Sequence, residues 1–207
     1  MLTRIDHLVY TADTLNRGMD EIELLLGIRP VLGGRHPDFG THNALLSLGP
    51  TTYLEIIARD PDMAIPERGL PFGLGSSKNS CLATWAYRSE SIEDQSLAAK
   101  QNGVDLGNIE QGSRQKPNGS SLSWKLTDPH AMILNGAVPF LISWGETIHP
   151  ARSAPRVGRL IGFRLEHPDP DGVRIALVAL GIEFPVQYAE KMRLLARVQT
   201  EEDIIEF

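Results

Sequence analysis

The sequence predicts an α+β fold built from repeated units, each made of a strand, a helix and further strands. Three observations support this prediction. An apolar strand, a helix and a glycine followed by a β-branched residue occur together three times. The glycines at 27, 103 and 181 are 76 and 78 residues apart, and self-similarity at a fixed spacing indicates repeated structural units. Short apolar runs bounded by turn residues predict strands between the helices.

The first unit has the clearest pattern. Residues 5–10 predict a strand, and the helix after it has Asp13 as its expected N-cap. The apolar residues of this helix recur at helical spacing on one face: Leu15, Met19, Ile22 and Leu26. Residues 44–48 and 52–57 predict two strands joined by a tight hairpin over 49–51.

The second unit repeats this order. Residues 82–87 predict its first strand, and Ser91 is the expected N-cap of its helix. Residues 121–126 and 140–144 predict strands. A turn is expected over 114–119 because a proline and an Asn-Gly pair follow one another there.

The third unit is shorter. Residues 160–165 predict its strand, and Asp169 followed by Pro170 predicts the N-cap and first residue of its helix. Gly181 is followed by 26 residues, enough for about two strands by usual strand lengths, which we expect at 193–200 and 204–207. We therefore expect four segments along the chain: a first module over 1–60, a connecting loop over 61–78, a second module over 79–146 and a partial third βαββ unit over 147–207.

Composition excludes several classes of protein. Of the 207 residues, 42% are hydrophobic, and the formal net charge of -6 comes with scattered basic residues, which argues against nucleic acid as the main partner. The single cysteine, Cys81, excludes an internal disulfide and CxxC-type zinc sites. The N-terminus shows no signal-peptide pattern, and no stretch reaches the roughly 20 apolar residues of a membrane span. We expect a cytoplasmic protein with no membrane partner.

His7 and Glu55 are the first candidates for chemistry. His7 lies in the first strand, where alternation places it on one face with Ile5 and Val9. Glu55 lies in the last strand of the first unit, between large residues at i±2. Burying either group is costly unless it is paired or bound, and together they offer ligands for Zn, Fe, Mn or Ni. A hydrogen-bonded core histidine and a Glu55 paired with an arginine are the alternatives.

His42 is the third candidate, because it begins a predicted strand. With His7 and Glu55 it would form a set of two histidines and one carboxylate, which leaves coordination positions open for a substrate. The alternative is that His42 caps or hydrogen-bonds a loop.

Six short segments resemble the glyoxalase-like family of the vicinal-oxygen-chelate superfamily, which includes glyoxalases, extradiol dioxygenases and bleomycin resistance proteins. They are IDHLVY (5–10), GGRHP (33–37), GTHNAL (40–45), TYLEII (52–57), PFLISW (139–144) and LEHP (165–168). The resemblance covers nearly the whole chain. It implies paired βαβββ modules whose curved sheets enclose a cavity, here with the partial third unit added, and a metal held by residues of both modules. His7 and Glu55 match the ligand positions of the first module.

The second module departs from this pattern. Counting back from the repeated glycines, the position of His7 corresponds to Ala83 and Ile161, and the last strand of the second module offers Ser143. None of these is a metal ligand of the expected kind, so a four-ligand site shared by both modules is not supported. The metal site is incomplete, or another residue such as His42 completes it, or the cavity holds no metal.

The resemblance also suggests residues for substrate binding. Arg114, Trp124 and Trp144 are placed to line the second half of the cavity and grip a carboxylate or an aromatic ring. The alternatives are ordinary core packing of the tryptophans and a solvated arginine.

The leading functional hypothesis is a glyoxalase-like enzyme of the lyase, isomerase or dioxygenase type. A divalent metal (Zn, Fe, Mn or Ni), held by His7 and Glu55 with His42, would chelate two adjacent oxygens of a small substrate and stabilise an enediolate-like intermediate. Glu55 could serve as the base. Two alternatives remain open: a metal-free protein that binds a small apolar or aromatic molecule, and a non-catalytic dimerising scaffold. A homodimer is expected in each case.

Overall fold

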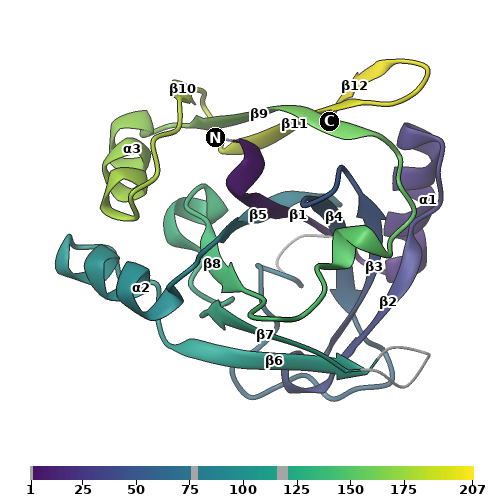
Figure 1. Cartoon of the computed structure of the whole chain (residues 1–207), viewed down its shortest axis with the longest axis horizontal. Helices are drawn as coiled ribbons and strands as arrows, with labels where there is room; N and C mark the ends of the chain where they lie inside the picture. The colour runs from purple at the N-terminus through teal and green to yellow at the C-terminus, as the bar shows by residue number, and fades with distance from the viewer. Residues whose placement is uncertain (1, 76–78, 116–120) are drawn as a thin grey trace.

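The computed structural model describes residues 2–75, 79–115 and 121–207, with the backbone alone at 114, 115 and 121. Twelve strands in these residues form one sheet of eight strands and one of four, with three α-helices outside them (Figure 1). The predicted α+β fold of paired modules is confirmed.

The first module consists of β1 (Ile5–Thr11), α1 (Leu15–Leu26), β2 (Val31–His36), β3 (Thr41–Ser47) and β4 (Tyr53–Arg59). β3 and β4 pair antiparallel, which confirms the predicted hairpin, and β4 then lies parallel to β1. β2 was not predicted. It pairs with β3 despite Gly33 and Gly34, and its register shifts between Leu32 and Gly34, as at a β-bulge.

The second module repeats this plan with β5 (Cys81–Arg88), α2 (Ile92–Gln101), β6 (Ile109–Gln115), β7 (Ser121–Thr127) and β8 (Phe140–Ser143). β8 lies parallel to β5. The predicted turn over 114–119 was wrong at 114 and 115, because both residues belong to β6 and pair with β7. The rest of that turn lies outside the described residues.

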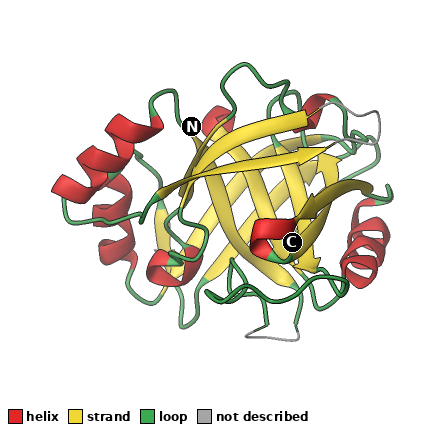
Figure 2. Cartoon of the chain, turned by 90° about the horizontal axis from the view of Figure 1, so that it is seen from below, coloured by secondary structure: helices red, strands yellow, loops and turns green. Residues whose placement is uncertain are grey.

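The two modules join within one chain. β1 and β5 pair antiparallel, so the eight strands run in the order β2-β3-β4-β1-β5-β8-β7-β6. The sheet curls so strongly that its two ends, β2 and β6, approach each other (Figure 2). The concave side of this sheet carries a small apolar cluster, whereas the main core lies between its convex side, the helices and the four-stranded sheet.

The third unit forms the four-stranded sheet. It contains β9 (Arg159–His167), α3 (Pro170–Ala179), β10 (Val186–Tyr188), β11 (Arg193–Gln199) and β12 (Ile204–Glu206), in the sheet order β10-β9-β11-β12. Figure 1 shows this sheet above β1 and β5, with α3 beside α2. Trp85 of β5 is fully buried, and its ring lies 5.3 Å from that of Phe163 and 5.7 Å from that of Phe184. These aromatic contacts attach the third unit to the convex side of the large sheet.

The helix ends follow the predicted turn chemistry with one correction. Thr14, not Asp13, caps α1, because the Thr14 hydroxyl accepts the backbone N–H of Arg17. Asp169 caps α3 as predicted. The repeated glycines 27, 103 and 181 have φ of 78°, 88° and 72°, the left-handed conformation in which a side chain is strained.

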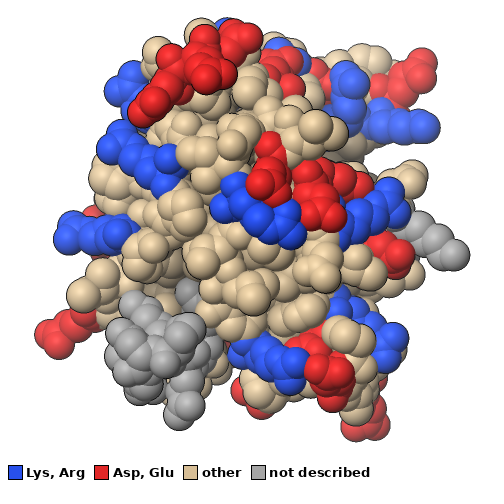
Figure 3. Space-filling view, turned by 90° about the vertical axis from the view of Figure 1, so that its right-hand side faces the viewer, with Lys and Arg blue, Asp and Glu red and all other residues tan. Residues whose placement is uncertain are grey.

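The surface shows no single-sign charge patch on the face that carries α1 and β2. Acidic and basic side chains alternate there between uncharged areas (Figure 3). Among the described residues, no helix is long and apolar enough to cross a membrane.

Candidate functional site

The curled sheet surrounds a partly open cavity of about 50 Å³. Both modules contribute to its wall, and the connecting loop adds Pro71 and Phe72. The polar lining residues with ionisable, amide or hydroxyl groups come from the first module: His7, His36, Thr41, Asn43, Tyr53 and Glu55. The cavity therefore has a polar wall, formed by these six residues.

The opposite wall is apolar. Its lining residues from the second module are Trp124, Leu126, Pro129, Phe140, Ile142 and Trp144, and the indole N–H groups are the polar side-chain atoms among them. The ring of Phe72 packs 5.3 Å from that of Phe140. Phe72 has a φ of 55°, which is unusual for a bulky residue and indicates a backbone constrained by its surroundings.

His7 and Glu55 meet at the polar wall. The Nε2 atom of His7 lies 3.5 Å from Oε2 of Glu55, and both side chains are almost fully buried. The parallel register of β1 and β4 explains this approach, because Val9 pairs with Glu55 and His7 pairs with Tyr53. The imidazole stacks on the Tyr53 ring at 4.6 Å between centroids, which fixes the plane of the imidazole.

Glu55 is held from its other side as well. Its Oε1 accepts a hydrogen bond of 2.5 Å from the Asn43 amide, whose own oxygen accepts from the backbone N–H of Gly34. The carboxylate is thus oriented by β3 and by His7 together. Such double support keeps the pair in one geometry.

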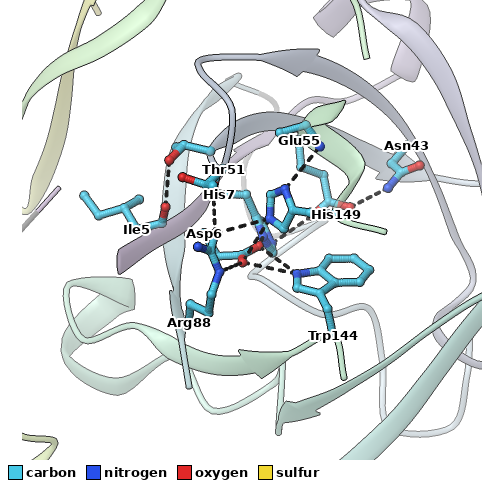
Figure 4. A network of polar contacts seen from close by, with 11 residues as sticks. Ile5, Asp6, His7, Asn43, Thr51, Glu55, Arg88, Trp144 and His149 are labelled. Atoms are coloured by element: carbon cyan, nitrogen blue, oxygen red, sulfur yellow. Dashed lines mark hydrogen bonds and ion pairs between the residues drawn. The ribbon is translucent and has the colours of Figure 1, made fainter. Parts of the chain in front are cut away.

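The other nitrogen of His7 faces Asp6. Nδ1 of His7 lies 2.9 Å from Oδ1 of Asp6, a carboxylate that is fully buried. Burial alone would raise the pKa of Asp6, but hydrogen bonds from His149 and His7 outweigh that effect and hold its pKa well below the usual range. Figure 4 shows His7 between the two carboxylates.

The face assignment of β1 needs a correction. Ile5 does not share the face of His7 and Val9, because the register of β1 against β5 shifts between Ile5 and His7. Ile5 packs into the core outside the cavity, whereas Val9 belongs to the cluster around Phe140. The extra residue at this bulge is Asp6.

His42 does not join His7 and Glu55. Its neighbours Thr41 and Asn43 line the cavity, so alternation along β3 places His42 on the outer face. There it lies among Asp60, Arg35 and Asp62, and burial lowers its pKa. The structure brings together two of the three predicted metal ligands.

The predicted substrate-binding residues have different outcomes. Trp124 and Trp144 both line the cavity, with their rings 5.5 Å apart. Trp124 lies flat against Gly112 of β6, where a Cβ atom would come within 2.3 Å of the indole. The side chain of Arg114 lies outside the described residues, so its role remains a prediction.

The second module offers no counterpart to His7 and Glu55. The N-caps Thr14 and Ser91 give the alignment of the two modules, and in that alignment Thr84 corresponds to His7. The pairing of Ala86 with Phe140 mirrors that of Val9 with Glu55. A threonine and a phenylalanine thus replace the expected ligands, rather than Ala83 and Ser143, but the conclusion from the sequence is unchanged.

A divalent metal does not fit the donor set. Among the described residues, no group of three or more His, Cys, Asp or Glu side chains is arranged to hold one. His7 and Glu55 supply two donors, whereas catalytic zinc sites have three protein ligands. Asn43 cannot easily supply a third, because its amide already bonds Glu55 and Gly34.

Three residues of the site were missed at the sequence level: Asp6, Asn43 and His149. Strand alternation predicts Asp6 on the face opposite His7, and no residue pattern near Asp6 indicates a bulge. Asn43 stands next to His42, on the face that in fact lines the cavity. His149 comes from the segment after β8 and reaches Asp6 at 3.1 Å only through the fold.

Comparisons with known proteins agree with this architecture. The model of the family described as glyoxalase-like domain matches residues 5–181. No curated protein matched the sequence. A hypothetical protein from Staphylococcus aureus has a similar structure, with a TM-score of 0.64 and 14% identity over 98% of this chain and 84% of that one. Methylmalonyl-CoA epimerase from Mycobacterium tuberculosis gives a TM-score of 0.44 and 16% identity over 68% of this chain and 87% of the other.

Proposed function

We propose, because this chain belongs to the glyoxalase-like domain family, that it is a small-molecule enzyme in which His7 and Glu55 transfer a proton on a substrate held in the cavity. The substrate class that this chemistry serves is a compact α-hydroxy carbonyl compound, with an acidic C–H on the carbon that carries the hydroxyl. The reaction type is an isomerisation or lyase reaction through an enediolate.

One observation carries the proposal: Nε2 of His7 and Oε2 of Glu55 lie 3.5 Å apart at the cavity wall. At this separation the carboxylate can stabilise the positive charge of the imidazole once His7 has taken up a proton. The pair takes the proton from the substrate carbon, the C–H electrons form the C=C bond of an enediolate, and the carbonyl oxygen becomes the oxyanion. Protonated His7 then donates to the oxyanion or returns the proton to the adjacent carbon.

The apolar wall supports the same proposal. Aromatic rings opposite the pair exclude water and hold the apolar part of the substrate. No step requires a metal, and the two-donor set argues against one. Bound to the site, a divalent ion would contact His7 and Glu55.

Deuterium exchange tests the proposal directly. The protein is incubated in D2O with 2-hydroxyacetophenone or lactaldehyde as probes, and loss of the C–H signal next to the carbonyl is followed by proton NMR. We expect exchange above the buffer rate, reduced roughly 10²-fold or more in His7→Gln. The control is Cys81→Ser, which changes an exposed side chain that does not line the cavity. Equal exchange in wild type and His7→Gln contradicts the proposal.

Elemental analysis separates this reaction from metal chelation. We expect purified protein to hold less than stoichiometric Zn, Fe, Mn or Ni, and the exchange rate to survive treatment with EDTA. One equivalent of metal that is lost in both His7→Gln and Glu55→Gln would overturn the metal-free reaction and support the chelate mechanism.

A metal-free binding protein is the second candidate function. The observation that favours it is the apolar wall, in which the described side chains have two indole nitrogens as their polar atoms. Because Trp124 and Trp144 line the cavity, quenching of tryptophan fluorescence reports occupancy. Binding of the aromatic probe without any catalysed exchange of either probe would favour this function over the enzyme.

A further inference from the structure

The bulge in β1 places a second acid directly behind His7. Ile5 pairs with Tyr87 and His7 pairs with Ala86, so Asp6 is the extra residue of the strand. Bulges re-aim side chains and are common beside active sites. Here the Asp6 carboxylate lies beside the imidazole of His7, the next residue in the chain, instead of on the opposite face of the strand.

We propose that Asp6 is a positioning residue that keeps the proton of His7 on Nδ1, so that Nε2 meets the cavity with a free electron pair, and that ties Trp144 of the opposite wall to the same carboxylate. This role rests on the proposed function, because Asp6 would position His7, the base of that reaction. It concerns a residue that does not itself line the cavity.

Four N–H groups converge on Asp6. His7 Nδ1 lies 2.9 Å from Oδ1, and Arg88 Nε donates to Oδ2 at 3.0 Å. The Trp144 indole lies 3.2 and 3.1 Å from the two oxygens, and His149 Nε2 lies 3.1 Å from Oδ2 (Figure 4). A carboxylate has about four acceptor sites, so this one is fully satisfied.

The donors come from separate parts of the fold. Arg88 lies in β5, where it also donates to the carbonyl of Thr51. Trp144 follows β8, and His149 lies in the segment before β9. Asp6 therefore connects the proposed base to the apolar wall of the cavity and to the segment that contributes Pro150 to the cavity.

This geometry determines the tautomers of both histidines. The backbone N–H of Ala151 donates to Nδ1 of His149 at 3.3 Å, and Nε2 of His149 lies 3.1 Å from Oδ2 of Asp6 and 3.4 Å from Nη2 of Arg88. The Ala151 donor and the shorter contact with the carboxylate place the proton of His149 on Nε2, facing Asp6. An ionised Asp6 can only accept, so the Nδ1 of His7 must donate to it. Nε2 of His7 is then the nitrogen that exchanges protons with Glu55 and the substrate. The lowered pKa of Asp6, which is set against burial by the hydrogen bonds from His149 and His7, is consistent with an acid that stays ionised.

The substitution Asp6→Asn tests the proposal, because an amide has the same shape and one acceptor oxygen. Arg88 carries a full charge, so we expect the amide oxygen to take the place of Oδ2 opposite Arg88. The NH2 group then faces His7 and Trp144. Since an indole cannot accept a hydrogen bond, His7 must accept from the amide, which moves its proton to Nε2 and blocks the base.

Two-bond ¹H–¹⁵N NMR spectra read this tautomer without any substrate. The His7 signals are identified by their loss in His7→Gln. In wild type we expect the protonated nitrogen of neutral His7 to be Nδ1, and in Asp6→Asn to be Nε2. The matched control is His149→Gln, which changes another partner of Asp6 but keeps the carboxylate, and we expect it to retain the wild-type tautomer of His7.

Three results would overturn the proposal. The first is a proton on Nε2 of His7 in the wild type. The second is a proton still on Nδ1 of His7 in folded Asp6→Asn, and the third is a proton on Nε2 of His7 in His149→Gln. The wild-type spectrum alone remains decisive if Asp6→Asn does not fold, as judged by circular dichroism. With an exchanging probe, Asp6→Asn is expected to lower the rate roughly 10²-fold while Trp fluorescence still reports probe binding. If neither probe exchanges with wild type, the proposed function fails but the tautomer result still stands.

Discussion

Besides apolar residues, the first module lines the cavity with two imidazoles, a carboxylate, an amide and two hydroxyl groups, whereas the second module lines it with indole, phenyl and aliphatic groups. Both modules have the same order of strands and the same parallel pairing of their first and last strands. In the alignment of the two modules, His7 corresponds to Thr84, and Glu55 corresponds to Phe140. The same arrangement of strands thus presents polar side chains to the cavity in the first module and apolar side chains in the second.

Under the proposed function, the two modules contribute different parts of one site. A metal centre shared by the modules needs donors from each, and the second module has none at these positions. Its apolar wall would hold an apolar group of the substrate while His7 and Glu55 act on the reacting part. The division predicts that substitutions in the two walls have separable effects on chemistry and on binding.

The largest expected effects on proton exchange and on probe binding come from two single substitutions, one in each wall. Glu55→Gln should lower catalysed proton exchange roughly 10²- to 10⁴-fold and leave probe affinity within a few-fold, because the amide keeps the shape but carries no charge to stabilise protonated His7. Phe140→Leu should weaken probe binding and change the rate at saturation much less. Titration of exchange rate against probe concentration separates the two. A comparable loss of saturated rate in both variants would show that the walls are not separable.

Acid should remove the stabilisation that Asp6 provides behind His7. The pKa of Asp6 is lowered in the folded protein, despite burial, by the hydrogen bonds from His149 and His7. Its stabilisation is therefore complete above the ordinary aspartate pKa of about 3.9 and is lost as the pH falls through that value toward the lower folded pKa. The difference in melting temperature between wild type and Asp6→Asn should be several degrees at pH 7 and should shrink at pH 3.

The control for this pH series is Asp105→Asn, which removes an exposed ion pair with Lys100. Exposed pairs contribute little to stability, so this variant should follow the wild type at each pH. A difference between wild type and Asp6→Asn that is constant from pH 7 to pH 3 would contradict the assigned direction of the Asp6 pKa.

A smaller effect is expected from the shape of the apolar wall. In Gly112→Ala the new Cβ atom would lie 2.3 Å from the Trp124 ring, so the ring must move. Overpacking of this kind costs about 1–3 kcal/mol and should shift tryptophan emission and weaken probe binding. Gly162→Ala in the third unit is the control, since its nearest contact is the Arg197 side chain at 3.2 Å. Unchanged emission and affinity in Gly112→Ala would exclude Trp124 as part of the binding wall.

The smallest effect is expected at His42. Because the side chain lies outside the cavity, His42→Ala should leave proton exchange and metal content within about twofold of wild type, with a stability change of roughly 0.5 kcal/mol. Elemental analysis and the exchange assay check this. A large loss of proton exchange would show that His42 belongs to the site and would contradict its placement on the outer face of β3.

Several features of the fold followed from local sequence. The repeated glycines, the hairpin between β3 and β4 and the cap at Asp169 each depend on residues close together in the chain. β2 was missed because Gly33 and Gly34 interrupt its apolar pattern, and only pairing with β3 makes the segment a strand. The whole of β6 was also missed, since turn-forming residues follow it directly and its last two residues were assigned to the predicted turn.

The candidate site was predicted in part. His7 and Glu55 were found because a polar group between large residues in a strand is costly to bury without a partner. Trp124 and Trp144 were expected at the cavity and line it. Asp6 was missed because strand alternation holds only without a bulge. His42 was placed with His7 because spacing along the chain does not reveal which face of a strand a residue takes.

Apolar periodicity and turn residues were therefore enough to specify the helices, most strands and the two residues at the centre of the site, because these depend on interactions within a few residues. The partners of those residues depend on distant segments. The register between β1 and β5 makes the bulge at Asp6, and the path of the chain after β8 brings His149 to that carboxylate. Register and chain path are set by the packing of whole sheets, so only the tertiary structure could reveal them.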